Sequence, residues 1–468
     1  MATLTMKFGG TCLGTPAALT QVISIILQEH ERWDQLIVVA SALDGVTDAL
    51  IEAAHLAQLS NRRGYRRIIA TVRTRHLALV DKLPLGPDER GGLRADIDQL
   101  LFEMLDVCQN LSDMPLEAGS AADQIDQVIG VGERLAARII AALLRENKLR
   151  GVAVDATDFV ITDDTFNNAT PDLIETQARI QQILIPMLSR NIIPVVTGFI
   201  GATTDGRPTT LGRGGSDYTA SIVGICTQSD AVWMWTEVDG MMSTDPREVE
   251  TAQVIPELSY SEVAELAFFG ARILHARMIE PLQRSDIPLY IKNVFKPQQP
   301  GTVVRSKSKD NTHRIKAVTV IQGIGLRANR AGSLHGITEL VSDTLEEKVG
   351  SPADVMIASQ SSKSTFLCFV IPTSAGPDAV HSAEHALVKV LDNHPENDEP
   401  WQVMPVSVVT AIGAQLDERP DVMAQVLVAV GDAPLLGIAQ GPARCSLSLI
   451  VLPEHADAVL ERVHSLTE

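Results

Sequence analysis

Two glycine-rich stretches carry most of the residues that could do chemistry. The first, Lys7-Phe-Gly-Gly-Thr11, ends an alternating apolar segment, and the second, Leu211-Gly-Arg-Gly-Gly-Ser-Asp217, leads into a small-residue stretch with a helical pattern from Tyr218. Closely spaced glycines let a backbone approach a ligand, and a helix N-terminus presents free N–H groups to an anion. A lysine ahead of such glycines suits phosphate oxygens. We therefore predict an anion-binding site formed by both stretches.

The second stretch also offers side chains of both charges. Arg213 supplies a cation, Asp217 a carboxylate and Ser216 a hydroxyl. The chain contains no GxxxxGK[ST] Walker loop, so a P-loop arrangement is excluded. A tight surface turn with two incidental charges is the alternative interpretation of this stretch.

Composition limits the class of protein. The 468 residues are enough for two or three domains, and 45% hydrophobic with 21% charged residues is ordinary for a globular chain. A net charge of −19 argues against binding nucleic acid or an anionic membrane. The first residues show no basic leader, no apolar run reaches membrane-spanning length, and the five cysteines are scattered. We therefore expect a cytoplasmic protein.

The elements that must position the two stretches follow an α/β pattern. Apolar runs predict buried strands at 3–8, 36–41, 192–198 and 231–236, with helical patterns between them, including single helices over 125–144 and 259–282. A polar linker at 306–311 is followed by two sets of strand, helix, two strands and helix. Two such sets indicate ferredoxin-like modules.

The stretch from Gly206 to Ala220 closely resembles the signature of aspartokinases, within the amino acid kinase superfamily. Lys7-Phe-Gly-Gly resembles the N-terminal motif of the same family, and the two C-terminal sets resemble its paired ACT regulatory modules. The resemblance implies a three-layer αβα fold with a mostly parallel central sheet over 1–305. It places ACT-like modules at 311–395 and 396–468, interleaved with one another.

The activity that this resemblance implies is phosphorylation of L-aspartate on its β-carboxylate by ATP, the first step of aspartate-family amino acid biosynthesis. Mg²⁺ would bind through the ATP phosphates and water, with no dedicated protein metal site. An end-product amino acid, lysine or threonine, would act as effector, and the ACT modules would join chains into a homodimer or homotetramer. The sequence contains no dinucleotide-binding fingerprint, so we do not expect a fused dehydrogenase.

The resemblance also carries roles onto individual positions. The predicted catalytic residues are Lys7, Gly10, Gly215 and Asp217. The predicted substrate-binding residues are Ser41, Thr47, Glu133, Arg213 and Ser216. The predicted nucleotide-binding residues are Lys7, Gly9, Gly10, Thr11, Thr236, Glu237, Asp245, Arg247 and Arg272. The predicted effector-binding residues are Asn329, Gly332 and Asp354, for which ordinary turn positions are the alternative. Ser41 and Thr47 could instead cap the next helix, and Glu133 could lie on a solvated helix face.

Four positions depart from the family pattern: Cys12 replaces a usual Ser, Glu237 an Asp, Arg272 a Lys and Ala276 a Pro. If Cys12 lies in the phosphate loop, thiol alkylation should lower activity. The departures leave open two other functions. One is an amino acid kinase that acts on another acid or on carbamate. The other is an amino-acid-binding regulatory protein whose kinase site has decayed.

Overall fold

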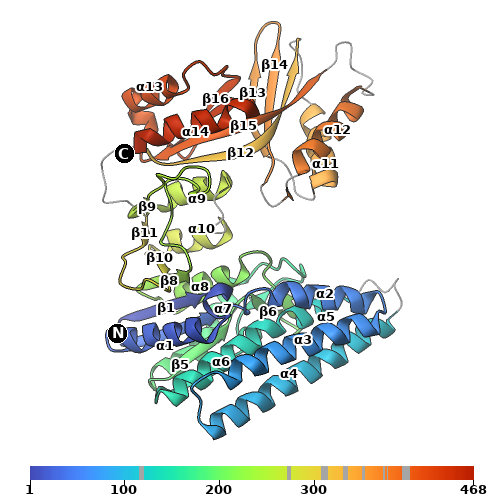
Figure 1. Cartoon of the computed structure of the whole chain (residues 1–468), viewed down its shortest axis with the longest axis vertical. Helices are drawn as coiled ribbons and strands as arrows, with labels where there is room; N and C mark the ends of the chain where they lie inside the picture. Colours follow the sequence, from blue (N-terminus) through green and yellow to red (C-terminus); the bar gives the residue numbers. More distant parts are fainter. Residues whose placement is uncertain are drawn as a thin grey trace. The chain divides into compact units, whose positions relative to one another are not determined.

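A computed structural model describes residues 1–114, 121–270, 276–306, 315–329, 336–349, 354–372, 375–376, 378–392 and 401–467. The chain forms two compact units, Met1–Met241 with Leu274–Ser306, and Met242–Ile273 with Lys307–Glu468 (Figure 1). The expected end of the catalytic domain at residue 305 lies one residue before the end of the first unit. Residues 242–273, expected in the catalytic domain, belong to the second unit.

The first unit is built on a largely parallel sheet. Its strands lie in the order β3-β5-β2-β1-β8-β10-β11. All neighbours up to β10 run parallel, and β11 is antiparallel to β10. The strands are β1 (Thr3–Phe8), β2 (Gln35–Ala40), β3 (Gly151–Val154), β5 (Ile193–Thr197), β8 (Ala231–Thr236), β10 (Leu289–Asn293) and β11 (Thr302–Arg305). A small separate sheet contains β4 (Ile161–Thr162), β6 (Ile200–Thr203) and β7 (Pro208–Thr210).

Helices cover both faces of the parallel sheet, so its central strands are buried on both sides and read as continuous apolar runs. Leu4, Met6 and Phe8 pack against α1 and α6, behind which α2 to α5 extend the same core. Helices α7 and α8 also pack on the sheet. The predicted three-layer α/β class is confirmed. The helices are α1 (Pro16–His30), α2 (Val46–Gln58), α3 (Arg62–Asp81), α4 (Pro87–Asp113), α5 (Ala122–Ile129), α6 (Val131–Glu146), α7 (Leu173–Leu188), α8 (Gly215–Cys226) and α10 (Ala276–Arg284).

Two helix predictions were wrong in ways that matter for the site. The single helix expected over 125–144 is interrupted at Gly130, where a Cβ would lie 2.7 Å from Cγ2 of Ile200, so this position needs glycine. Helix α8 begins at Gly215, not at Tyr218, because Gly214 has a positive φ of 72° that turns the chain into the helix. Ser216 and Asp217 therefore lie in its first turn.

The second unit holds one antiparallel sheet in the order β13-β14-β12-β15-β17-β16. Its strands are β12 (Ile315–Ala328), β13 (Asp354–Gln360), β14 (Thr365–Val370), β15 (Gln402–Gly413), β16 (Gly437–Gln440) and β17 (Ser446–Val451). Its helices are α9 (Tyr260–Phe268), α11 (Ile337–Val349), α12 (Ala379–Asp392), α13 (Pro420–Ala429) and α14 (Ala456–His464), and a short strand β9 (Glu257–Ser259) precedes α9. The helix expected over 259–282 is thus two helices, with residues 271–275 outside the described part.

Two long strands are shared between the modules of this sheet. The second half of β12 pairs with β14 and packs against α11 and α12, while its first half packs against α13 and α14. The first half of β15 pairs with the second half of β12, which has β14 on its other side. Ser407–Ile412 of β15 pairs with β17. Each ferredoxin-like module therefore takes its fourth strand from the other.

Contacts to this sheet explain why residues 242–269 belong to the second unit. The ammonium of Lys316 on β12 lies 3.1 and 3.2 Å from the two carboxylate oxygens of Glu262, and both side chains are buried. Ser243 accepts the N–H of Val318 at its carbonyl, and its hydroxyl lies 2.8 Å from Nε2 of His464. No helix among the described residues is both long and apolar enough to cross a membrane.

Candidate active site

A cavity of about 760 Å³ lies at the carboxyl ends of β1 and β2 in the first unit. In parallel α/β sheets the strand ends and the loops after them form the usual ligand site. The loops after both strands and the start of α8 contribute to the cavity wall. Nine of the predicted residues line it: Lys7, Gly10, Ser41, Thr47, Glu133, Arg213, Gly215, Ser216 and Asp217.

Lys7 joins the two glycine-rich stretches. It is the penultimate residue of β1, and its Nζ lies 2.5 Å from Oδ1 of Asp217 in the first turn of α8. The two side chains are 13% and 18% exposed, so the pair faces the cavity without being open to bulk solvent. Arg213 is exposed at the cavity wall, and no ion pair or hydrogen bond of its side chain is seen within the described ranges. The cavity thus presents one paired and one available cation.

Two helix N-termini open onto the same cavity. Gly45 and Gly214, both with positive φ, precede α2 and α8, and neither helix start has a side-chain cap. The first N–H of each helix, on Val46 and Gly215, donates to the carbonyl of Leu43 and Gly212. The N–H groups that follow in each first turn are available to an anion. Since Gly45 holds the N-cap position, the interpretation of Ser41 and Thr47 as helix caps is wrong. Thr47 lies in the first turn of α2, and Ser41 directly follows β2.

The glycines of the first stretch allow a close approach of backbones. A Cβ on Gly10 would lie 2.7 Å from the carbonyl oxygen of Ala42, in the loop after β2. Gly10 also accepts the N–H of Asp44 at its carbonyl. These contacts bring the loops after β1 and β2 together at the cavity, an arrangement that fits a phosphate group.

Glu133 is a buried carboxylate at the cavity, 3% exposed on α6. Its Oε1 accepts the N–H of Ala42 at 3.1 Å, and Oε2 has no hydrogen-bond partner. Burial raises its pKa to about 8, against weaker lowering by its hydrogen bonds and by the charges of Arg134 and Lys7. The interpretation as a solvated helix face is therefore wrong. An unsatisfied buried carboxylate is suited to receive a cationic group of a ligand.

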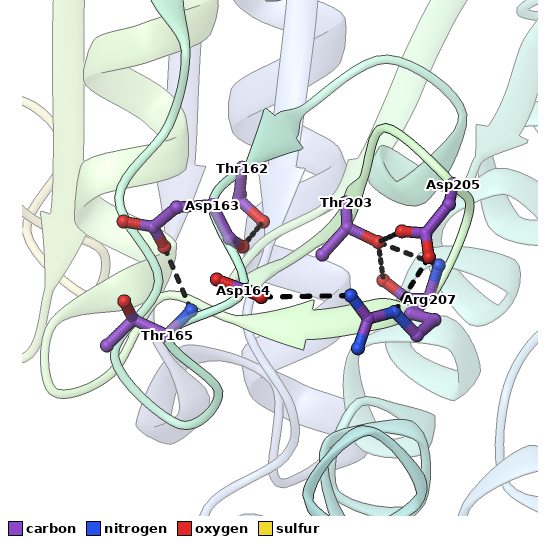
Figure 2. Close-up of polar contacts among 7 residues, drawn as sticks. All are labelled: Thr162, Asp163, Asp164, Thr165, Thr203, Asp205 and Arg207. Carbon is purple, nitrogen blue, oxygen red and sulfur yellow. Dashed lines mark hydrogen bonds and ion pairs between the residues drawn. The ribbon is translucent and has the colours of Figure 1, made fainter.

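Polar side chains lie between the loop after β4 and the β6–β7 hairpin, which together form one wall of the site; Figure 2 shows these polar contacts. Oδ1 of Asp163 accepts the N–H groups of Thr165 and Thr170 and so closes the loop on itself. Arg207 of the hairpin pairs with Asp205 at 2.9 Å and lies 3.9 Å from Asp164 of the loop. Asn167 on the loop and Thr210 at the end of β7 both line the cavity.

Sequence reasoning missed the residues that hold this wall in place. Asp126 on α5, 1% exposed, accepts N–H groups from Asn167 and Thr210. Arg277 on α10 donates to Leu211 O and Ala169 O, and its guanidinium lies 5.1 Å from the ring centroid of Tyr218. Asp126 lies in an amphipathic helix, where an acidic residue is normally on the exposed face. The sequence pattern therefore did not indicate that Asp126 is buried.

Known proteins support a family assignment. The profile of the amino acid kinase family matches residues 3–293, more than half of the chain. The chain belongs to the amino acid kinase family. A bifunctional aspartokinase/homoserine dehydrogenase 1, chloroplastic, of Arabidopsis thaliana is 30% identical over 98% of this chain and 50% of its own length. The chain thus spans about half the length of that relative.

A curated relative and a solved structure match this chain over almost their whole length. The lysine-sensitive aspartokinase 3 of Escherichia coli strain K12 is 28% identical over 98% of both chains. The crystal structure of E. coli aspartokinase III in complex with aspartate and ADP is 25% identical, with a TM-score of 0.75 over 99% of both chains. The likeness therefore extends through the second unit as well as the first.

The structure places only some of the predicted nucleotide-binding residues near the cavity. Thr236 ends β8 and Glu237 follows it; because β8 pairs with β1, both lie at the same sheet edge as Lys7. Burial raises the pKa of the Cys12 thiol, and the negative charge of Glu237 acts in the same direction, against the charge of Lys7. Gly9 donates its N–H to Trp235 O beside them, and Thr11 is the middle residue of the helical turn that follows, Gly10–Cys12. These residues border the cavity rather than line it.

The remaining predicted residues fall elsewhere. Asp245 and Arg247 belong to the second unit and form a 2.5 Å ion pair with each other, while Arg272 and Gly332 lie outside the described residues. Asn329 is exposed just after β12, and Asp354 begins β13. Cys12 is fully buried, and its thiol donates to Trp235 O at 3.4 Å. Contrary to the placement considered from the sequence, it does not line the cavity. No cluster of three or more potential metal ligands occurs in the described ranges.

Proposed function

We propose that this chain phosphorylates the β-carboxylate of L-aspartate with ATP and Mg²⁺. The observation that carries the proposal is the convergence of Lys7, Arg213, Glu133 and two uncapped helix N-termini on one cavity. The aspartokinase names of the relatives, and the aspartate and ADP in the E. coli complex, favour this substrate pair over another acid or carbamate. None of these three relatives is named as a non-catalytic regulatory protein.

Charge complementarity assigns each end of the substrate. The guanidinium of Arg213 binds the α-carboxylate through a bidentate pair. The buried Oε2 of Glu133 binds the α-ammonium, which supplies the hydrogen-bond donor that this oxygen lacks in the free protein. The β-carboxylate is then directed towards Lys7. An aspartate side chain in water has a pKa of about 3.9, so this carboxylate is ionised at neutral pH and needs no general base.

The reaction is a displacement at phosphorus. One β-carboxylate oxygen forms a bond to the γ-phosphorus of ATP while the bond from that phosphorus to the bridging oxygen breaks, and ADP leaves with the electron pair. Two anions must approach, and charge shifts within the phosphoryl group, so the main requirement is fixed positive charge. Lys7 and the open N–H groups in the first turn of α8, including that of Ser216, supply it. Asp217 holds the Lys7 ammonium in position.

Nucleotide and metal binding complete the proposal. The loop of Gly9, Gly10 and Thr11 contacts the phosphates, and Thr236 and Glu237 border the nucleotide; Asp245, Arg247 and Arg272 stay assigned to it by resemblance alone. Mg²⁺ binds through the phosphates and water, in keeping with its reluctance to lose its hydration shell.

The second unit is proposed to regulate the kinase. The E. coli relative is named lysine-sensitive, which makes lysine the first effector to examine and threonine the second. Asn329, Gly332 and Asp354 stay the proposed effector residues. Pairing of ACT modules from separate chains would give a homodimer or homotetramer. A cytoplasmic location fits a biosynthetic kinase of this kind.

Trapping of aspartyl hydroxamate from aspartate, MgATP and hydroxylamine tests the activity directly. We expect product from the wild-type chain, little from Lys7→Ala, and suppression by lysine or threonine added separately. Another acid that gives a hydroxamate faster than aspartate would reassign the substrate. A wild-type chain that binds lysine yet forms no hydroxamate would instead favour a regulatory protein with a decayed site.

A further inference from the structure

The turn that carries Arg213 is held from outside by a buried carboxylate. Asp126 lies on α5, and its Oδ2 accepts the N–H of Thr210 at 2.8 Å and that of Asn167 at 2.9 Å. Its Oδ1 accepts the hydroxyl of Thr210 at 3.0 Å. All three donors come from segments distant in the chain. At 1% exposure the carboxylate has no compensating water contact at the surface.

These hydrogen bonds fix the chain three residues before Arg213. Thr210 uses its N–H and hydroxyl on Asp126, while its carbonyl accepts the N–H of Ala169 at 2.9 Å. Leu211 follows, donating to Phe199 O. Gly212 then turns with a positive φ of 74°, and a Cβ there would lie 2.6 Å from Oδ1 of Asn168. The path from Asp126 to Arg213 therefore contains little backbone freedom.

A cation holds the other side of the same turn. Arg277 donates to the carbonyl oxygen of Leu211 at 2.9 Å and to Oδ1 of Asn168 at 2.6 Å. The loop bearing Asn167 and Asn168 is thus bonded both to Asp126 and to Arg277. Arg213 itself is exposed, and its side chain makes no hydrogen bond or ion pair within the described part of the chain, so its direction depends on its backbone.

We propose that Asp126 is a positioning residue for aspartate binding: it sets the direction of Arg213 through Thr210 and Asn167. The inference rests on the proposed role of Arg213 towards the α-carboxylate. Asp126 does not touch the substrate. Its effect is a geometric one, because a bidentate pair needs both guanidinium N–H groups aimed at the carboxylate.

The role requires hydrogen-bond acceptance and not charge. The two N–H donors share one oxygen, which an amide oxygen can replace, and the Thr210 hydroxyl can accept from an amide NH₂ as readily as it donates. Asp126→Asn should therefore keep the turn in place, whereas Asp126→Ala should release it. This rescue separates positioning from a general loss of a buried charge.

Steady-state kinetics of the full chain, with aspartate and ATP varied in turn, test the inference. We expect Asp126→Ala to raise the KM for aspartate about tenfold or more, with the KM for ATP changed less than about twofold. Asp126→Asn should restore most of the affinity. Asp123→Ala removes a carboxylate from the same helix without these contacts and should resemble the wild type. If Asp126→Ala does not fold, Thr210→Val removes only the hydroxyl and should shift the aspartate KM in the same direction.

A double-mutant cycle decides whether Asp126 acts through Arg213. In an Arg213→Ala background the substitution of Asp126 should cause no further rise in the aspartate KM. Equal changes in both KM values, an additive effect in that background, or failure of Asp126→Asn to rescue would overturn the inference. An Arg213→Ala variant with an unchanged aspartate KM would instead remove the proposed role of Arg213. A strong effect of Arg213→Ala with none from Asp126→Ala would overturn this inference alone.

Discussion

Nζ of Lys7 lies 2.5 Å from Oδ1 of Asp217, and this ion pair connects the end of β1 with the first turn of α8. The two residues belong to different glycine-rich stretches, which meet because β1 and β2 are adjacent parallel strands and α8 packs on both. The pair keeps a cation at the cavity in the absence of a phosphate. A phosphate that binds there can take up the remaining N–H donors of the ammonium without moving it.

Replacement of Lys7 should therefore affect turnover more than folding. We expect Lys7→Ala to lower kcat by about 10²–10³, the range typical for loss of one electrostatic contact to a transition state. Lys7→Arg should not restore the rate, because the planar guanidinium cannot occupy the place of a compact ammonium beside Asp217. The hydroxamate assay measures the rate, and circular dichroism confirms the fold. Full activity of Lys7→Ala would contradict this role.

Glu133 should make aspartate binding dependent on pH. With a pKa of about 8 the side chain is protonated at pH 7 in the free protein, and pairing with an ammonium requires its carboxylate. Binding at pH 7 should thus release about one proton, and affinity should rise about tenfold per pH unit up to that pKa and then level off. Isothermal titration calorimetry in buffers of different ionisation enthalpy measures the release. Glu133→Gln should abolish it, and a wild-type chain with no proton release would contradict the assignment.

The same pKa shift predicts how the stability of the ligand-free protein varies with pH. The pKa of Glu133 is raised from its ordinary value of 4.5, so the folded state binds the proton more tightly than the unfolded chain. Its contribution to stability is present below pH 4.5 and is lost as pH rises towards 8. Melting temperatures across this window should fall less steeply for Glu133→Gln than for the wild type. Parallel curves for the two proteins would argue against a buried, protonated Glu133.

Gly10 and Gly9 offer a matched pair for testing the close approach of two loops. A Cβ on Gly10 would lie 2.7 Å from Ala42 O, while on Gly9 the nearest atom, Trp235 O, is 3.6 Å away. We expect Gly10→Ala to lower the free energy of unfolding by about 1–3 kcal/mol, as overpacking does elsewhere. Gly9→Ala should leave the melting temperature nearly unchanged. Equal melting temperatures for both variants would show that the loop after β2 can move away.

The buried pair of Lys316 and Glu262 should be important for the stability of the second unit. Lys316→Met leaves the carboxylate of Glu262 buried without its cation, a loss of about 3–5 kcal/mol in comparable cases. Lys348 pairs with Glu347 at the surface, so Lys348→Met should change stability by less than about 0.5 kcal/mol. Urea unfolding measures both variants. Adding Glu262→Gln to Lys316→Met should cost less than the sum of the single changes, and simple additivity would argue against a coupled pair.

The sequence by itself determined the fold class and marked the two glycine-rich stretches that meet at the cavity. Such motifs are local, because the glycines and charged residues at a strand or helix end are adjacent in the sequence. That is why the sequence was enough to find Lys7, Gly10, Gly215 and Asp217. The parallel sheet followed from apolar runs that are buried on both faces. The pattern of strands and helices after residue 315 likewise indicated two ferredoxin-like modules.

Only the tertiary structure decided how distant residues combine. Asp126 and Arg277 hold the Arg213 turn through backbone groups, which every residue carries and no sequence pattern marks. Gly130 needs to be glycine because Ile200 packs against it, and the early start of α8 depends on the φ of Gly214. The exchange of strands β12 and β15 between modules, and the attachment of residues 242–269 through Lys316 and Glu262, arise from pairing across long chain separations. Local periodicity holds no information on such pairings, because their free energy comes from the packed state as a whole.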